Sequence, residues 1–171
     1  PAASIQSTGT WASGGNLNTS RWVVSGFAGT QTANLLMGGY SPSAPVAKTE
    51  SYDGTTWTAA SNAGAYGGGS GDEGHLSGTQ NDAIGSGTTS QATWDGTAWA
   101  AIVAKPEDRH QAGLAGGSAV ALLAGGGPNP GSSIATTLEW NNSFATGSFL
   151  ITKKKASSVA VANQAGGAER V

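Results

Sequence analysis

Two closely similar phrases decide the fold: "SYDGTTWT" at residues 51–58 and "TWDGTAWA" at residues 93–100. Each contains an aromatic residue, the pair Asp-Gly and then a tryptophan. Asp-Gly between β-prone flanks is typical of a tight hairpin turn, because both turn residues must adopt positive φ. Related phrases occur at 3–11 ("ASIQSTGTW") and at 137–144 ("TLEWNNSF"). The sequence therefore predicts one recurring hairpin rather than two isolated turns.

A two-residue turn also predicts which side chains face each other in the first hairpin. Tyr52 would pair with Thr55, and Glu50 would pair with Trp57. Tyr52 and Trp57 would then lie diagonally on one face of the sheet, within reach of each other. The second phrase would place its two tryptophans on one face in the same way.

The hairpin phrase recurs with a period of about 42–46 residues. Trp11, Trp57 and Trp99 are 46 and 42 positions apart, and Phe144 follows after another 45. Glycine recurs too often for helices, and no apolar stripe of period 3.6 persists, so each unit is expected to consist of strands. Upstream of the later copies lie apolar runs that end in glycine, with a weaker copy near the C-terminus: "LLMGG" (35–39), "AIGSG" (83–87), "LLAGG" (122–126) and "ASSVAVANQAGG" (156–167).

This order of an apolar run, a double glycine, an aromatic residue and a later tryptophan resembles the kelch repeat of β-propellers. The matches are "LLMGG" with Tyr52 and Trp57, "LLAGG" with Trp140 and Phe144, and "AIGSG" with Trp94 and Trp99. Phenylalanine replaces tryptophan in the second of these, and the double glycine is broken in the third. The Gly-, Thr- and Ala-rich phrasing also looks like that of kelch-like repeat proteins of tailed bacteriophage particles.

The resemblance implies an all-β, kelch-like β-propeller of about four four-stranded blades within one repeat domain, 1–171. The expected units are 12–57, 58–99, 100–144 and a composite of 1–11 with 145–171. Joining the N- and C-terminal segments in this composite blade would hide strand edges that otherwise promote aggregation. The alternative is an open array whose half units are completed by neighbouring subunits. The expected core residues of the repeats are Trp11, Tyr52, Trp57, Trp94, Trp99, Trp140 and Phe144.

The composition is that of a folded, loop-rich domain. The chain has 28 glycines, but also six tryptophans, and its net charge is only −2; disordered chains usually combine high charge with few aromatic residues. A nucleic-acid partner is not expected, because the one basic run, 153–155, is too small for a phosphate-binding surface. Membrane insertion is not expected either, since no apolar stretch approaches ~20 residues. The start of the chain shows no secretory signal.

No residue pattern predicts catalysis, a metal site or a cofactor. The absence of cysteine excludes thiolate ligands and disulfides. His75 and His110 each follow two acidic residues ("DEGH", "EDRH"), but adjacent acidic side chains in a loop usually diverge, so both segments are expected to be solvated turns. The glycine-rich segments 67–71 and 124–127 lack the lysine of a phosphate-binding loop, and no nucleophile elbow occurs. The chain is therefore predicted not to be an enzyme.

The resemblance implies a structural or adhesive protein of a virus particle, located in the virion as a phage tail or capsid-surface component. Its partners would be further copies of itself and other virion proteins. The alternative is a carbohydrate-binding module that contacts host-surface glycans through Trp22, Tyr40 and Tyr66, because exposed aromatic rings stack on sugars. A competing interpretation makes Trp22 a strand residue and uses the tyrosines to cover neighbouring blades. A copper oxidase on a kelch scaffold would need a Cys-linked tyrosine, which this chain cannot form.

Overall fold

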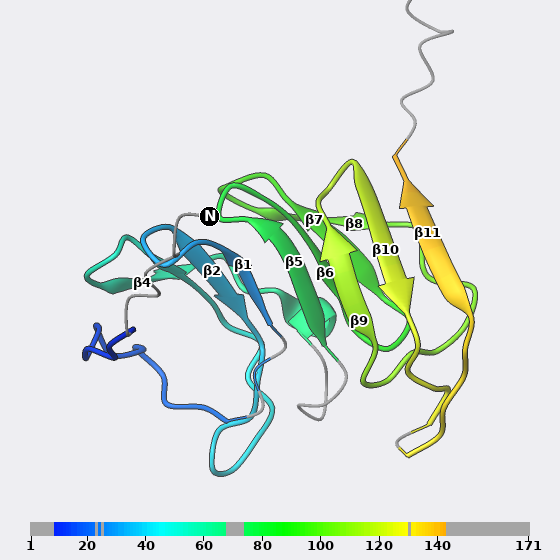
Figure 1. Ribbon diagram of the computed structural model, residues 1–171, viewed down its shortest axis with the longest axis horizontal. Coiled ribbons are helices and arrows are strands. Elements are labelled where there is room, and N and C mark those ends of the chain that lie inside the picture. Colours follow the sequence, from blue (N-terminus) through cyan, green and yellow to red (C-terminus); the bar gives the residue numbers. More distant parts are fainter. Residues whose placement is uncertain (1–8, 23, 25, 68–73, 130, 143–171) are drawn as a thin grey trace, which may run out of the picture. The chain divides into compact units, whose positions relative to one another are not determined.

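The computed structural model describes residues 9–22, 24, 26–67, 74–129 and 131–142 (Figure 1). These residues form three antiparallel sheets of four, four and three strands, which confirms the all-β part of the predicted fold. The sheets belong to one compact unit, Pro1–Asn141; of the second unit, Asn142–Val171, only Asn142 is among the described residues. The composite blade predicted from the two ends of the chain lies almost wholly outside the described residues.

Each sheet is a meander in which strands that are consecutive in the sequence pair with each other. The first sheet contains β1 (Phe27–Gly29), β2 (Asn34–Met37), β3 (Thr49–Tyr52) and β4 (Trp57–Ala60). The second contains β5 (His75–Thr79), β6 (Asp82–Ser86), β7 (Gln91–Trp94) and β8 (Trp99–Ile102). The third contains β9 (Gly113–Gly116), β10 (Val120–Ala124) and β11 (Thr137–Asn141). A short 3₁₀ helix, Gly64–Gly67, follows the first sheet.

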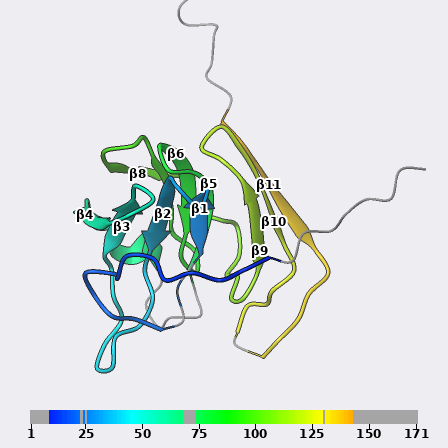
Figure 2. The same cartoon turned by 60° about the vertical axis from the view of Figure 1, so that its left-hand side comes forward.

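The first strands of successive sheets lie beside each other: β1 contacts β5, and β5 contacts β9 (Figures 1 and 2). Polar groups in the hairpin loops connect the same sheets. The Gln80 amide donates to the carbonyl of Tyr52 at 2.7 Å, and the Asp82 carboxylate accepts from Ser118 N–H at 3.0 Å. Hydrogen bonds from Ser118 also lower the pKa of Asp82. Neighbouring sheets are thus held together along their first strands and at their loops.

The Asp-Gly hairpins are present, but the predicted register of the first is wrong. Tyr52 pairs directly with Trp57, whereas the sequence predicted Thr55 as its partner. Glu50 pairs with Ala59 instead of Trp57. The loop between the two strands therefore contains four residues rather than two.

The reason lies in the aspartate side chain. The carboxylate of Asp53 accepts hydrogen bonds from the backbone N–H groups of Thr55 and Thr56, both at 2.8 Å. Only Gly54 in this loop has a positive φ, of 95°. Asp95 makes the same two 2.8 Å bonds to the backbone of its own loop. The Asp-Gly pair thus acts as a side-chain cap of a longer loop, as aspartate often does in turns.

The direct pairing brings the aromatic rings of each hairpin together. The ring centroids of Tyr52 and Trp57 are 4.8 Å apart, with an interplanar angle of 29°. Those of Trp94 and Trp99 are 5.3 Å apart and tilted by 47°. The prediction that each pair shares one face of its sheet is confirmed.

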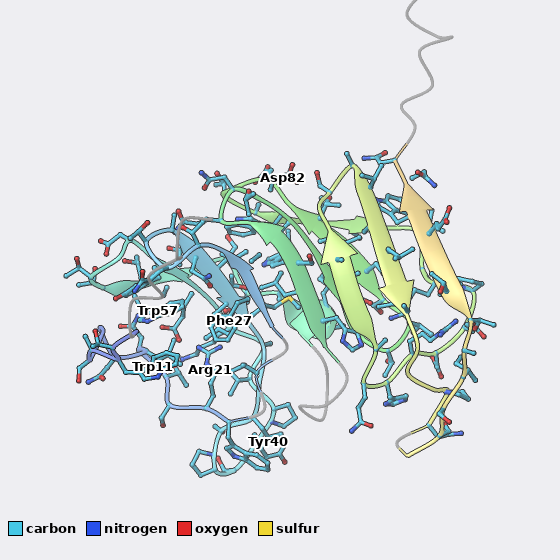
Figure 3. The ribbon with its side chains drawn as sticks, in the orientation of Figure 1. Trp11, Arg21, Phe27, Tyr40, Trp57 and Asp82 are labelled. Carbon is cyan, nitrogen blue, oxygen red and sulfur yellow. The ribbon has the colours of Figure 1, made fainter. Side chains whose placement is uncertain are left out.

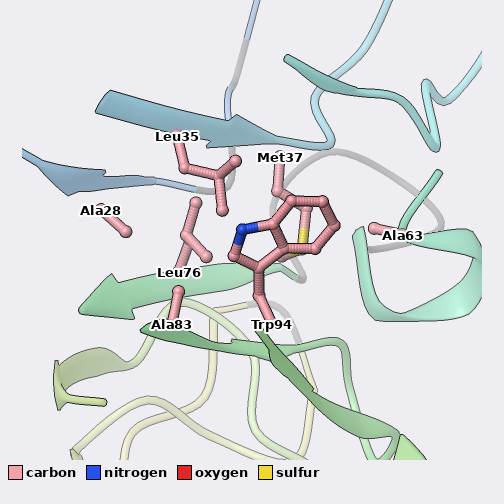
Figure 4. Close-up of a cluster of buried hydrophobic side chains, with 7 residues drawn as sticks. All are labelled: Ala28, Leu35, Met37, Ala63, Leu76, Ala83 and Trp94. Atoms are coloured by element: carbon pink, nitrogen blue, oxygen red, sulfur yellow. The ribbon is translucent and has the colours of Figure 1, made fainter. Parts of the chain in front are cut away.

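The main hydrophobic core lies between the first and second sheets (Figure 4). The indole of Trp94 is 3% exposed, and the indole N–H of Trp99 donates to the Thr49 hydroxyl across the interface at 3.0 Å. Gly85 makes room for this contact, because a Cβ there would lie 2.8 Å from the Trp99 ring and 2.9 Å from the sulfur of Met37. The buried cluster comprises Ala28, Leu35, Met37, Ala63, Leu76, Ala83 and Trp94. The aromatic face of the second sheet therefore packs on the Leu35 face of the first.

Truncation of Trp94 to alanine should lower the free energy of unfolding by about 3–5 kcal/mol, because a buried indole is replaced by a cavity. Chemical denaturation of Trp94→Ala measures the loss. Trp22→Ala is a matched control, since Trp22 is 58% exposed and its truncation should cost about 1 kcal/mol or less. Equal losses in the two variants would show that the core does not depend on Trp94.

Candidate functional site

The strand register shows which positions correspond in the three sheets. In each sheet, the aromatic residue of the third strand pairs with one residue of the second strand: Tyr52 with Asn34, Trp94 with Ala83, and Trp140 with Ala121. The next residue of the second strand is therefore Leu35, Ile84 or Leu122. Leu35 and Ile84 are 0% and 1% exposed, whereas Leu122 is 43% exposed. The same position is thus buried in two sheets and open in the third.

The open position belongs to an apolar face on the third sheet. Val120, on the same side of β10 as Leu122, is 59% exposed. A shallow hollow runs over this face between β9 and β11, lined by Ala115, Gly116, Val120, Ala121, Leu122, Glu139, Trp140 and Asn141. We call the residues on the Leu122 side, which are Ala115, Val120, Leu122, Glu139 and Asn141, the open face; Ala121 and Trp140 alternate with them and line the cavity towards the second sheet. Among the described residues no further sheet covers it, although the next sheet covers the corresponding face of the first and second sheets.

A second hollow lies between the second and third sheets. It is a cavity of ≈ 150 Å³, and most of its wall is apolar. The second sheet contributes Ile84, Ser86 and Gln91, and the third contributes residues that include Leu123 and Trp140. The interface between these two sheets is therefore less completely filled than the one around Trp94.

One buried cationic side chain anchors each sheet, at the carbonyl of the glycine that follows the second strand. Arg21 donates to Gly38 O at 2.9 Å, and Arg109 donates to Gly125 O at 2.6 Å. Lys105 donates to the carbonyl of Gly87 at the corresponding place in the second sheet. In each sheet, the aromatic residue of the third strand pairs with one residue of the second strand, and the glycine lies four residues after that second-strand residue. Sequence reasoning missed this recurring contact, because the cation precedes the glycine in two sheets and follows it in the other.

In the first sheet the anchor is a buried ion pair. The guanidinium of Arg21 is 0% exposed and contacts the carboxylate of Glu50, which is 1% exposed. The other carboxylate oxygen of Glu50 accepts from the backbone and side-chain N–H groups of Asn18 at 2.8 and 2.9 Å. These bonds attach the segment before β1 to the first sheet.

In the second and third sheets the anchors lie among two histidines. His75 and His110 are 6% and 9% exposed, so the prediction that they occupy solvated turns is wrong. Burial, followed by the charge of Lys105, lowers the pKa of His75 to about 4, although a hydrogen bond to the backbone of Arg109 opposes this. Burial likewise lowers the pKa of Lys105 to about 8. In the described part of the chain no three potential metal ligands come together, and both acidic residues of "DEGH", Asp72 and Glu73, lie outside that part.

The aromatic residues predicted to bind sugar divide into two groups. Trp22 and Tyr40 form an antiparallel bridge through two reciprocal 2.8 Å backbone hydrogen bonds, and their ring centroids are 5.3 Å apart. Trp22 is 58% exposed, so this pair presents an aromatic surface at a loop. Tyr66 does not join them, because it packs against the main core from the 3₁₀ helix.

The aromatic residues that the sequence predicted to lie in the core of the repeats differ in how deeply they are buried. Trp94 is buried, and Tyr52, Trp57, Trp99 and Trp140 are partly buried. Trp11 is fully exposed (Figure 3), so the expectation that it is a core residue is not met by the described structure. Phe144 lies outside the described residues.

No protein-family model matches the sequence, and no curated protein matches it. No helix in the described ranges is long and apolar enough to cross a membrane.

The buried His75 should make the fold less stable in acid. Its pKa is about 4 in the folded chain and 6.5 in the unfolded chain, so the unfolded chain takes up the proton first as the pH falls. The stabilising effect of the neutral imidazole is complete above pH 6.5, is lost progressively below it, and stops declining below about pH 4. The expected loss is about 3 kcal/mol. Urea denaturation at several pH values should show this decline in the wild type and a flatter profile in His75→Asn; identical profiles would refute it.

Proposed function

We propose that this chain is a non-enzymatic assembly protein, whose sheets are blades of a kelch-like β-propeller completed across neighbouring copies. The observation that carries the proposal is Leu122. It is 43% exposed at a position where Leu35 and Ile84 are buried by the following sheet. Contiguous apolar surface of this kind is characteristic of protein–protein contact sites. A further sheet of the same repeat fits this face, because the chain already uses such packing in its main core.

We place the assembly in a virus particle, as a structural or adhesive component of a phage tail or capsid surface. The support is the resemblance of the repeat phrases to kelch-like phage proteins, together with adjacent first strands in three successive sheets. The partners would be copies of the chain and other virion proteins. Proteomic analysis of purified virions tests the location, and absence of the chain from them would contradict it.

The open face makes the assembly directly testable. Leu122→Glu places a charge at the centre of the face and should shift the protein from oligomer to monomer in sedimentation velocity, because burying an unpaired charge is costly. Ala100→Glu, at an exposed position of β8, is the matched control and should leave the oligomer intact. A monomeric wild type at all concentrations, or an unchanged oligomer in Leu122→Glu, would contradict the proposal.

A second candidate function is supported by the loop aromatics. The exposed ring of Trp22, held beside Tyr40 by two backbone hydrogen bonds, is suited to stacking on a sugar face. Host-surface glycans would then be ligands of the assembled protein.

For this candidate, a glycan array should show binding by the wild type, and Trp22→Ala should lose it. Tyr66→Phe, altered at a tyrosine that packs on the core, should bind as the wild type does. An array without hits, or equal binding by Trp22→Ala, would exclude the sugar site.

A further inference from the structure

Two hollows with polar walls lie between the loops of the first and second sheets. The larger has a volume of ≈ 470 Å³, and most of the side chains that line it end in a hydroxyl or an amide: Ser51, Ser61, Gln80, Asn81 and Thr97. The smaller has a volume of ≈ 230 Å³ and is also lined by Gln80 and Asn81. We call the two hollows together the polar groove. The larger one falls within the range of small-molecule sites, about 300–1,000 Å³.

The interface between the second and third sheets shows why the smaller hollow is open. There the Asp82 carboxylate (Figure 3) accepts from Ser118 N–H and bridges the two hairpin loops. The strand register makes Ala33 the counterpart of Asp82, and Gln80 the counterpart of Ser118. Because a methyl group cannot make this bridge, space remains between Ala33 and the loop of the second sheet.

The loop at the centre of the groove is fixed by the protein itself. The Gln80 amide donates to the carbonyls of Asn34 and Tyr52 at 3.2 and 2.7 Å, which engages both of its N–H groups. The backbone carbonyl of Gln80 accepts from the Trp94 indole N–H at 2.9 Å. A ligand would therefore meet an ordered loop and would not have to order it on binding.

Asn81 is the polar side chain that this loop presents. It lies over the glycine of the second Asp-Gly loop, since a Cβ at Gly96 would be 3.4 Å from the Asn81 side-chain oxygen. Thr32 occupies the same place over Gly54 in the first sheet. Asn81 is exposed, and within the described ranges no hydrogen bond engages its side chain. Its amide is thus able to donate and to accept.

The chemistry of the walls indicates the class of ligand. Hydroxyl and amide groups both donate and accept hydrogen bonds, as the hydroxyl groups of a sugar do. No charged side chain of the described residues lines either hollow. Asp82 and Asp95 are adjacent in sequence to Asn81 and Gly96, and hydrogen bonds lower the pKa of both carboxyls, so both are ionised at neutral pH. Their charges would repel an anionic ligand.

We propose that the polar groove binds a neutral oligosaccharide, and that Asn81 supplies its central hydrogen bonds. Neither Trp22 nor Tyr40 lines the groove, so this site is separate from the aromatic pair described above. The inference goes beyond the proposed assembly function, because the groove is built within one copy of the chain.

An array of neutral and sialylated oligosaccharides tests the site. The wild type should bind neutral glycans in preference to sialylated ones. Asn81→Ala should weaken this binding ~10-fold, as expected for the loss of one or two hydrogen bonds. Gln31→Ala is the matched control, because it removes an exposed amide from the corresponding loop of the first sheet and should bind as the wild type does.

A second pair of variants blocks the groove without removing Asn81. Thr97→Trp places a large side chain at the exposed wall of the larger hollow and should abolish binding. Thr55→Trp makes the same change at the corresponding exposed position of the first Asp-Gly loop and should retain it.

The outcomes separate the groove from the other proposals. Neutral-glycan binding that survives both Asn81→Ala and Thr97→Trp, or that only Trp22→Ala removes, would overturn the groove. An array without neutral hits, or a preference for sialylated glycans, would also overturn it. Leu122→Glu should bind sugar as the wild type does, so loss of assembly and loss of sugar binding are distinguishable.

Discussion

The packing of one aromatic face on the preceding sheet is the contact on which the rest of the structure depends. Trp94 and Trp99 of the second sheet lie against Leu35 and Met37 of the first, and a glycine at position 85 lets the two sheets approach. The indole supplies a large apolar area, and its N–H is satisfied by a specific acceptor. The corresponding aliphatic face of the third sheet, around Leu122, is not covered by a further sheet of the described residues.

Buried arginine and lysine side chains stabilise the ends of the second strands, and the amino-acid composition alone does not indicate this role. Arg21 and Arg109 each satisfy a glycine carbonyl after a second strand. No lysine or arginine occurs at 61–74, the segment that leads into the second sheet, and Lys105 makes the corresponding bond from beyond β8. A compact ammonium replaces a planar guanidinium there. Burial lowers the pKa of this Lys105 ammonium, and burial followed by the charge of Lys105 lowers the pKa of His75.

The sequence predicted the strands and the shared faces of the aromatic pairs, because Asp-Gly phrases and apolar runs are local signals. It did not predict the four-residue loops, since Asp53 caps its loop through side-chain hydrogen bonds rather than through a two-residue turn. The burial of His75 was also missed, because acidic neighbours suggest solvent and the burying sheets are distant in the sequence. The exposure of Leu122 was not predictable, because in sequence its run is equivalent to that of Leu35. Only the arrangement of sheets distinguishes the two.

The described residues combine one filled sheet interface, a second interface that retains a cavity of ≈ 150 Å³, an open face around Leu122 and an exposed tryptophan. These features support the proposed assembly function. An experimentally determined structure of the assembled protein tests this most directly at Leu122. If the sheets repeat across copies, the aromatic face of another sheet will cover Leu122 and bury it as Leu35 is buried. An assembled structure in which Leu122 remains in solvent would contradict the central claim.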